Sequence, residues 1–540
     1  MTSSASRRQE AVRRRRRGRL RVLAFAVALV AAAALALTAG IIWWSGATLA
    51  GDPVALARVE VQPLGGSLVS AEAFGAGGAR IPLATAGGRL EPRVLVAPGE
   101  AVTVVVVVRR PGWLGWALGR SRTERLSLRT PVTHLEEQWP TLSAHAPLRL
   151  RFAAAVDRVG YRMRGRAHSV TARGSRVVSL GPQSSSGTIE IASAARSWER
   201  LGEPVRVTWF PASRLPVVLV SPPLDRPISP LAPIRLTFSR TVGATRPQFS
   251  ARVPGSWRTV DSHTLVFTPT GFGLPLASSL HLEFPTRFSV STGRGPATAT
   301  RTIAVNVAGA SFLRLQQLLA DEGYLPLDWQ PTGATVARNP QAEIDAAVSP
   351  PDGSFRWRFP GTPSELQRNW IEGQPNQIIR GAVMMFQHDH HLVVDSFAGA
   401  QVWHALLADA IAGTKRTEGY SYVYVHRNVP QLLTLWHNGK IVLTSPGNTG
   451  VPAAPTQLGT YPVFEHIPVG TMSGTNPDGS HYNDPGIRWI SYFHRGEALH
   501  AFTRASFGTP QSLGCVELPL ATAAQVWPYT PIGTLVTVEN

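Results

Sequence analysis

An uncharged apolar stretch near the N-terminus constrains this chain more than any other feature of its sequence. The stretch VLAFAVALVAAAALALTAGIIWW, residues 22–44, contains 23 residues without a charge, and a helix of that length crosses a hydrocarbon core of about 30 Å. Nine arginines and one glutamate precede it in residues 1–21. Because positively charged flanks stay in the cytoplasm, the pattern predicts a cytoplasmic tail, one transmembrane helix and a chain that lies outside after Trp44.

Two other interpretations of this region remain open. A cleaved signal peptide would be cut near residues 48–50, although the apolar run is longer than the roughly 7 to 15 residues of a typical signal segment. The arginines would also suit a nucleic-acid patch, but the adjoining apolar run accounts for them as the flank of a membrane helix. We therefore predict the cytoplasmic (inner) membrane as a partner, with a single-pass anchor, and no nucleic-acid partner.

The outer part of the chain begins with many short apolar runs. A length of 540 residues predicts several domains, and 49 glycines and 44 prolines divide the apolar runs in the way typical of strands joined by turns. The pattern predicts three β modules, at residues 53–138, 139–213 and 214–308. The third contains PISPLAPIRLTFSRTV and HTLVFTPTG and resembles bacterial immunoglobulin-like modules, which implies a β-sandwich that serves as a spacer or in adhesion.

The pattern becomes helical after residue 310. LQQLLADEGYL places leucines at helical spacing, and GAVMMFQHDHHLVVDSFAGAQVWHALLADAI predicts two helices around a turn. Together these segments resemble a peptidoglycan-binding helical module over residues 310–413, with a long insertion around residues 341–361. The resemblance implies tethering to the glycan of the cell wall.

Within that module the run HDHH, residues 388–391, raises a metal hypothesis. Zinc needs three or four converging ligands, whereas consecutive side chains point in different directions. We therefore interpret the run as a solvated helix end and predict no metal and no cofactor.

Residues 418–540 return to a β pattern. The runs YSYVYVHRN, LLTLWHNGKIVLTSPG, RWISYF, EALHAFT and GTLVTVEN predict strands. The pair Asn438-Gly439 between two apolar runs predicts a hairpin with a type I′ turn. The region therefore predicts a β-rich domain of its own.

Cys515 in PQSLGCVELP is the only cysteine of the chain. A nucleophilic thiol needs a base within hydrogen-bond reach and donors for the oxyanion. His500 lies on a predicted strand 15 residues earlier, and the loop-like RASFGTPQS between them can bring the two together. The alternative is an inert buried thiol, because free cysteines are often buried.

The segments GEALHAF, FGTPQSLGCVELP and WPYTPIGTLVTV resemble the catalytic domain of L,D-transpeptidases, the YkuD-like family, and NTGVPAAPTQLGTYPVF fits an earlier stretch of the family pattern. The resemblance implies that Cys515 is the nucleophile and His500 the general base. It implies that Ser512 and Gly514 shape the turn, with backbone amides near Gly514 and Cys515 as oxyanion donors. Possible substrate contacts are Arg504, Tyr492 and His494.

The predicted fold class is thus a multidomain, mainly β chain. It has an N-terminal transmembrane helix, β-sandwich (Ig-like) modules, a small α-helical peptidoglycan-binding-like module and a C-terminal β-rich L,D-transpeptidase-like catalytic domain. The resemblance implies a membrane-anchored enzyme outside the cell that acts on peptidoglycan stem peptides and forms 3→3 cross-links. Water as the acceptor would make the same Cys/His site an L,D-carboxypeptidase.

Two positions depart from the family pattern. Leu513 stands where the pattern has histidine, and Glu517 where it has arginine or asparagine. Leu513 cannot accept or donate a proton, and Glu517 inverts a charge that Arg504 is a candidate to restore. His494 is a turn residue or a second base. A wall-binding scaffold that has lost its activity is the alternative function that these departures leave open.

Overall fold

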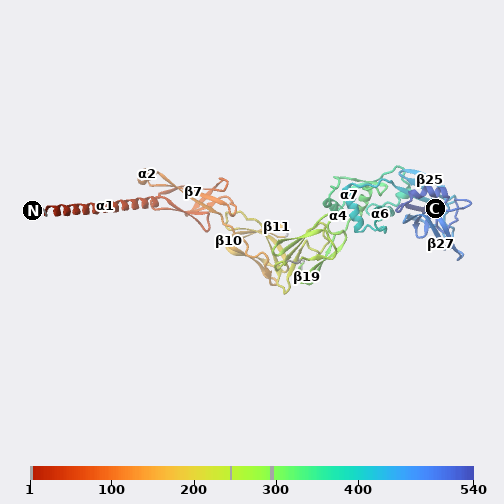
Figure 1. Ribbon diagram of the computed structural model, residues 1–540, viewed down its shortest axis with the longest axis horizontal. Helices are drawn as coiled ribbons and strands as arrows, with labels where there is room; N and C mark the ends of the chain where they lie inside the picture. Colours follow the sequence, from red (N-terminus) through yellow and green to blue (C-terminus); the bar gives the residue numbers. More distant parts are fainter. Residues whose placement is uncertain (1–3, 164, 244–245, 292–296) are drawn as a thin grey trace. The chain divides into compact units, whose positions relative to one another are not determined.

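The computed structural model describes residues 4–163, 165–243, 246–291 and 297–540 (Figure 1). The described chain divides into two compact units, one that ends at Arg214 and one that begins at Leu215. Strands dominate both units, which confirms the predicted mainly β fold. Helix α1 (Ser4–Trp44) opens the first unit, and its part Val22–Trp44 is long and apolar enough to cross a membrane.

The first unit contains three sheets, with strand orders β1-β2-β6-β5, β4-β3-β7-β8 and β11-β10-β12-β13-β9. The alternating sequence AVTVVVVVR explains β7, because its even-numbered valines are almost fully buried while the residues between them reach the surface. The elements are β1 (Ala47–Gly51), β2 (Ala57–Val61), β3 (Ser67–Phe74), β4 (Arg80–Ile81), β5 (Leu83–Ala86), β6 (Arg89–Pro92), β7 (Ala101–Arg109), α2 (Gly112–Leu118), β8 (Ser121–Arg129), β9 (Thr141–Leu142), β10 (Pro147–Met163), β11 (Arg166–Pro182), β12 (Gly187–Ala194) and β13 (Val205–Pro211).

The second unit begins with a seven-stranded sheet in the order β16-β19-β14-β15-β18-β17, with β20 beside β19. Its core contains Val218, Leu236, Phe267 and Leu282. The strands are β14 (Val217–Ser221), β15 (Ile234–Phe238), β16 (Gln248–Phe249), β17 (Gly255–Asp261), β18 (Thr264–Pro269), β19 (Ser279–Ser291) and β20 (Thr298–Asn306).

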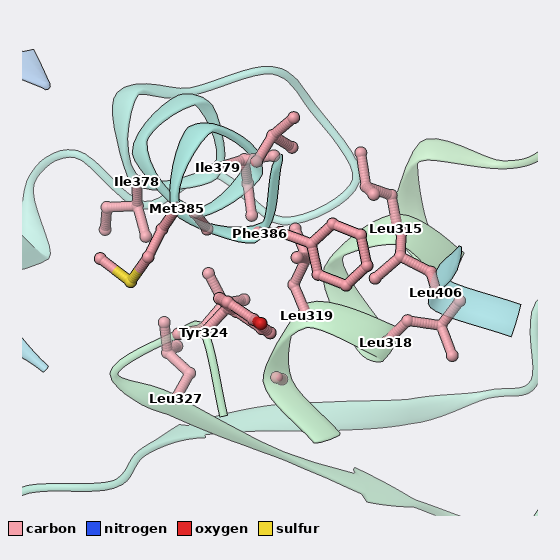
Figure 2. Close-up of a cluster of buried hydrophobic side chains, with 14 of the residues drawn as sticks. Leu315, Leu318, Leu319, Tyr324, Leu327, Ile378, Ile379, Met385, Phe386 and Leu406 are labelled. Atoms are coloured by element: carbon pink, nitrogen blue, oxygen red, sulfur yellow. The ribbon is translucent and has the colours of Figure 1, made fainter. Parts of the chain in front are cut away.

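A helical part follows, built around one apolar core (Figure 2). The two helices predicted around a turn are confirmed as α6 and α7, whereas the segment 341–361 forms most of α4 and the strand β22, which pairs with β21. Buried leucines of α3 and the ring of Phe386 from α6 meet in this core. The elements are α3 (Phe312–Asp321), β21 (Leu327–Pro331), α4 (Pro340–Val348), β22 (Gly353–Trp357), α5 (Ser364–Gln367), α6 (Gln377–Asp389) and α7 (Ala400–Ala412).

The C-terminal part consists of two sheets, β25-β24-β23-β31-β26 and β27-β28-β29-β30. Asn438 and Gly439, both with positive φ, join β24 to β25 as the hairpin pattern predicts. The elements are β23 (Ser421–His426), β24 (Leu432–His437), β25 (Lys440–Pro446), β26 (Gly459–Pro462), β27 (Glu465–Thr475), β28 (His481–His494), β29 (Glu497–Ala501), β30 (Val516–Leu518), α8 (Leu520–Val526), the 3-10 turn η1 (Trp527–Tyr529) and β31 (Leu535–Glu539).

The middle strands of the first of these sheets, β24, β23 and β31, are buried on both faces, whereas the edge strand β25 is largely exposed. Tyr422 of β23 belongs to the core of the helical part, while its neighbour Val423 belongs to the core between the two C-terminal sheets. Helix α6 packs against the sheet where Gly381 faces Gly533, and a Cβ at either glycine would lie 2.4 Å from the carbonyl oxygen of the other. The helical part, whose last helix ends before residue 413, and the C-terminal sheets, which begin after residue 418, therefore share one apolar core.

Candidate active site

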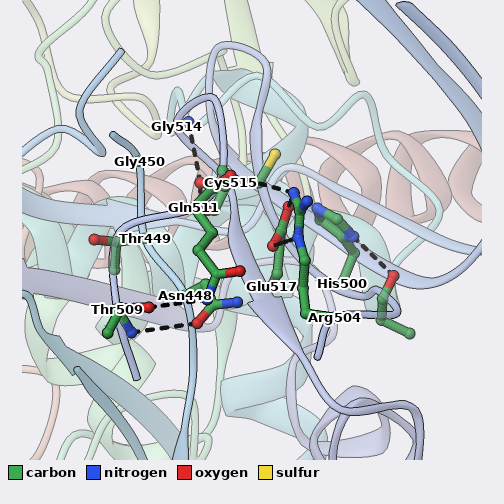
Figure 3. A network of polar contacts seen from close by, with 12 residues as sticks. Asn448, Thr449, Gly450, His500, Arg504, Thr509, Gln511, Gly514, Cys515 and Glu517 are labelled. Carbon is green, nitrogen blue, oxygen red and sulfur yellow. Dashed lines mark hydrogen bonds and ion pairs between the residues drawn. The ribbon is translucent and has the colours of Figure 1, made fainter. Parts of the chain in front are cut away.

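Cys515 immediately precedes β30, which runs parallel to β29 with His500 opposite Glu517. Leu499, Val516 and Leu518 point into the core between the two sheets. Since side chains alternate along a strand, His500, Cys515 and Glu517 lie on the opposite face of these strands. Strand pairing thus brings together the cysteine and the histidine that the sequence singled out (Figure 3).

His500 is held in one tautomer. Its side chain is buried, and Nδ1–H donates a hydrogen bond of 2.9 Å to the carbonyl oxygen of Ala501. Burial lowers the pKa of His500 below its usual range. This effect is larger than the opposite effect of the Ala501 carbonyl oxygen, which stabilises the protonated ring. The ring is therefore neutral at neutral pH, with Nε2 free of a proton and able to accept one.

The thiol of Cys515 is protonated in this state. Sγ lies 3.6 Å from the Gly496 carbonyl oxygen, to which the thiol donates. Burial raises the pKa of Cys515 to about 12, helped by the charges of Glu517 and Glu497 and opposed by the Ala498 backbone N–H. Attack by this sulfur requires a base that removes the proton as the new bond forms.

Ser512 closes the turn that presents the thiol. Its Oγ donates to the Cys515 carbonyl oxygen at 2.6 Å and accepts the Gly514 N–H at 3.2 Å. Gly514 has a φ of 113°, and a Cβ there would also lie 3.3 Å from Cγ of Glu497, so the position requires glycine. Of the two amides named in the sequence analysis, Gly514 is thus engaged, and Cys515 N–H has no acceptor among the described residues.

Glu517 is paired rather than bare. Arg504 Nε donates to its Oε2 at 2.8 Å and Nη2 to its Oε1 at 2.7 Å, which makes a two-pronged ion pair with a carboxylate that is almost fully buried. The guanidinium also donates to the Gln511 carbonyl oxygen and stacks 4.6 Å above the ring of Phe502. Arg504 compensates the inverted charge at Glu517, and its donors are largely occupied.

Asn448 is a site residue that sequence reasoning missed. Its backbone exchanges two hydrogen bonds with Glu517, and its Oδ1 accepts the N–H of Gly508 at 2.9 Å and of Thr509 at 3.3 Å. The buried side chain thereby ties the loop before Cys515 to the strand after it. No local pattern marks this asparagine, because its partners lie about 60 residues further along the chain.

The other predicted contacts divide into two groups. Tyr492 and Tyr482 pack, together with Cys515, against one small apolar cluster of Met472, Ile487, Ile490 and Ala498. Tyr482 had not been singled out in the sequence. His494 lies beside Glu497, with Nδ1 3.4 Å from Oε2 of Glu497 and its ring 4.3 Å from the ring of Tyr461.

The side chains of residues 388–391 diverge. His390 stacks on Phe386 and lies 3.0 Å from the carboxylate of Asp409, while His388 is exposed at the end of α6. Within the described ranges, no group of three or more His, Cys, Asp or Glu side chains is placed to hold a metal ion.

Comparison with known proteins identifies the C-terminal part. Residues 420–538 match the family described as the L,D-transpeptidase catalytic domain (YkuD). No curated protein matches the chain.

Solved structures with similarity to the chain include three L,D-transpeptidases. One from Mycobacterium smegmatis has 13% identity over 60% of this chain and 99% of that chain, with a TM-score of 0.21. The catalytic domain from Enterococcus faecium has 23% identity over 23% and 100%, with a TM-score of 0.21. L,D-transpeptidase 3 from Mycobacterium tuberculosis has 12% identity over 59% and 97%, with a TM-score of 0.21.

The assignment rests on the family match, which covers β23 to β31 and contains both His500 and Cys515. Members of this family are cysteine acyltransferases. Residues 420–538 are therefore an L,D-transpeptidase catalytic domain of the YkuD family.

Proposed function

We propose that this chain is a membrane-anchored cell-wall L,D-transpeptidase in which Cys515 is the nucleophile and His500 the general base. The observation that carries the proposal is the pairing of β29 with β30, which puts a neutral, tautomer-fixed histidine on the same face as the thiol. The donor is a peptidoglycan stem peptide, cleaved between its third residue, a diamino acid, and a terminal D-alanine.

The first step forms a thioester. Nε2 of His500 takes the thiol proton while Sγ of Cys515 attacks the carbonyl carbon of the scissile amide. The negative charge that develops on the carbonyl oxygen is stabilised by the backbone N–H of Cys515. The C–N bond then breaks, and D-alanine leaves as a free amine after it receives the proton from His500.

The second step transfers the acyl group. The side-chain amine of a neighbouring stem attacks the thioester carbon, His500 accepts its proton, and the proton returns to the sulfur as the C–S bond breaks. The product is a 3→3 cross-link and a regenerated Cys515 thiol. If water attacks instead, the same site releases a shortened stem and acts as an L,D-carboxypeptidase.

Arg504 and Glu517 act as positioning residues in this proposal. The ion pair holds β30 and the loop before Cys515 together, because Arg504 bonds to both Glu517 and the Gln511 carbonyl. Tyr492 and Tyr482, which pack with Cys515 against the same apolar cluster, are the proposed substrate contacts. Arg504 pairs with Glu517 and so compensates the charge by which this position departs from the family pattern. This pairing supports an active enzyme over a wall-binding scaffold that has lost its activity.

The remaining parts keep the roles implied by their sequence patterns. Residues 22–44 anchor the chain in the cytoplasmic membrane, with residues 1–21 inside and the bulk of the chain facing the wall. The modules 53–138, 139–213 and 214–308 act as spacers. The module 310–413 holds the wall and raises the local concentration of stem peptides near Cys515.

The test uses the full chain in detergent micelles with a peptidoglycan fragment that carries a tetrapeptide stem. Mass spectrometry should detect released D-alanine and a 3→3 dimer, and Cys515→Ala should lose both while its thermal unfolding midpoint stays near that of the wild type. A shortened stem without dimer would assign the carboxypeptidase. Absence of D-alanine release from the wild type would favour the scaffold.

A second experiment tests the anchor. After expression in a bacterial host, the mass of the purified chain reports whether the N-terminal segment is still present, and alkaline carbonate extraction reports whether the chain is embedded in membrane. An intact chain that resists extraction supports the anchor, whereas a chain cut near residues 48–50 would be a secreted enzyme.

A further inference from the structure

The helical part contains a pocket of about 330 Å³ that is separate from Cys515. It opens between the end of α3, the region around β21 and α4, and the end of α7. Apolar side chains of Leu318, Trp329 and Val336 form part of its wall. The lining also contains seven ionisable side chains: Arg314, Asp321, Glu322, Arg338, Glu343, Asp409 and Lys415.

Glu322 is the unusual member of this lining. Its side chain belongs to a residue that is only 3% exposed, and neither carboxylate oxygen has a hydrogen-bond partner among the described residues. Buried carboxylates are normally paired, because an unpaired one costs several kcal/mol of solvation. Burial, followed by the charges of Asp409 and Asp321, raises the pKa of Glu322 well above its usual range.

Glu343 in the same pocket shows the usual arrangement. Its Oε2 lies 2.7 Å from Nη2 of Arg314, and both side chains are buried. This pair is internally neutral, and Arg314, the buried arginine of the lining, uses Nη2 for Glu343 and Nη1 for Gln317, which leaves only its Nε without a partner among the described residues. Arg338 and Lys415 are exposed. The two oxygens of Glu322 are thus left for a donor that comes from outside the chain.

The charges of the lining define that donor further. With all seven side chains ionised, three positive and four negative charges sum to a net charge of minus one. A ligand that satisfies Glu322 and Asp321 must carry ammonium groups, and one that satisfies the exposed cations Arg338 and Lys415 must carry a carboxylate. Trp329 and Leu318 offer apolar surface for a methylene chain between them.

We propose that this pocket binds a diamino acid, with one ammonium group on Glu322, the second at Asp321 and the carboxylate at Arg338 and Lys415. Such a ligand carries a net charge of plus one at neutral pH, which neutralises the lining. Its size of about ten non-hydrogen atoms suits a pocket at the small end of the usual range of roughly 300 to 1,000 Å³. The pocket lies outside the residues that perform the acyl transfer, so the proposal holds or fails independently of Cys515.

The experiment is isothermal titration calorimetry of the full chain in detergent micelles, with lysine of either hand as the probe. Two analogues of lysine each lack one of its charged groups: norleucine lacks the side-chain ammonium group, and 1,5-diaminopentane lacks the carboxylate. The proposal predicts binding of at least one lysine enantiomer, with each relative weaker by about tenfold or more, since each loses one charged hydrogen-bonded contact.

Glu322→Gln should weaken lysine binding by about tenfold or more, because it keeps the shape of the side chain and removes its charge. The matched control is Glu372→Gln, an exposed glutamate of the same part of the chain outside the pocket, which should bind as the wild type does. Cys515→Ala should bind lysine unchanged, which separates this site from the acyl-transfer site.

Three results would overturn the proposal. If neither lysine enantiomer binds at about 10 mM, the pocket is not a diamino acid site. Equal affinity of lysine and 1,5-diaminopentane would remove the carboxylate contact. Unchanged affinity of Glu322→Gln, with an unfolding midpoint no lower than that of the wild type, would show that the ligand binds elsewhere.

Discussion

Two buried glutamates in the second unit are treated in opposite ways. Glu517, beside Cys515, is held by two hydrogen bonds from Arg504, whereas neither oxygen of Glu322, at the end of α3, has a partner in the part of the chain that the structure describes. Both side chains are almost fully buried. The chain thus supplies its own cation where a carboxylate supports the catalytic turn, and supplies none to the carboxylate of Glu322 in the lining of the pocket proposed to bind a diamino acid.

The largest expected effect comes from removal of the cation. Arg504→Ala leaves Glu517 buried and unpaired, and breaking a buried pair costs about 3–5 kcal/mol. Because the Arg504 side chain is itself 31% exposed, we expect a cost below that range, about 2–3 kcal/mol of unfolding free energy. Denaturant unfolding measures it.

Arg488→Ala, which changes an exposed arginine of β28, is the control for this loss and should cost less than about 0.5 kcal/mol. If Arg504→Ala were as stable as this control, the ion pair would not support the turn. The double variant Arg504→Ala/Glu517→Gln should recover part of the loss, because no unpaired charge remains.

The raised pKa of the thiol predicts slow alkylation. A shift of the Cys515 pKa from the ordinary 9.0 to about 12 lowers the thiolate fraction at pH 8 about a thousandfold. The greater nucleophilicity of a more basic thiolate recovers part of that, so iodoacetamide should react roughly thirtyfold more slowly than with a free cysteine. Mass spectrometry over time measures the rate.

The rate of that alkylation should rise about tenfold for each pH unit between 7 and 9, because the pKa lies above this range. A plateau below pH 8 would mean that the resting thiol is already ionised. His500 would then not need to remove the thiol proton during the attack.

The smallest pair of effects compares the two glutamates directly at pH 7. Glu517→Gln should lower the unfolding free energy by about 1 kcal/mol, because the arginine loses its charged partner but keeps a neutral acceptor. Glu322→Gln should raise it by about 1 kcal/mol, because an unpaired buried charge disappears. Chemical denaturation of both variants beside the wild type measures the two changes.

The gain from Glu322→Gln should depend on pH. The folded-state pKa of Glu322 lies above its usual 4.5, so the folded chain binds the proton more tightly than the unfolded chain does. Stability is therefore full below about pH 4.5 and is lost as the pH rises toward the folded pKa. The two chains should be equally stable near pH 4 and diverge above it, and a gain that is constant with pH would contradict the assignment.

The sequence predicted the elements of the catalytic domain better than the contacts between them. The Asn438-Gly439 turn, the strand that carries His500 and the loop that leads to Cys515 all follow from local patterns. The pairing of Arg504 with Glu517 does not, because it depends on how a loop folds back over a strand 13 residues later. The sequence indicates Arg504 only as a candidate positive group near the site, and the structure shows that it is paired with Glu517.

Local sequence patterns also could not predict the apolar core that the helical part shares with the C-terminal sheets. Tyr422 and Val423 are neighbours in β23 that are buried on opposite faces of the sheet, so the strand lacks the alternation of a half-exposed one. The helices that cover the outer face come from residues before 413, and no pattern within residues 418–540 indicates them. Glu322 was missed for a similar reason, since the sequence cannot say which acidic side chain lacks a partner.

The most direct test of Cys515 as nucleophile and His500 as its base is the mass of the intact chain, expressed from residue 45 onward, after incubation with a carbapenem. Such a drug acylates an activated thiol, and proton removal by His500 is worth about 10²–10⁴ in rate. One adduct should form on Cys515, at least a hundredfold more slowly in His500→Ala. Equal acylation rates of the wild type and His500→Ala, or no adduct on either, would contradict it.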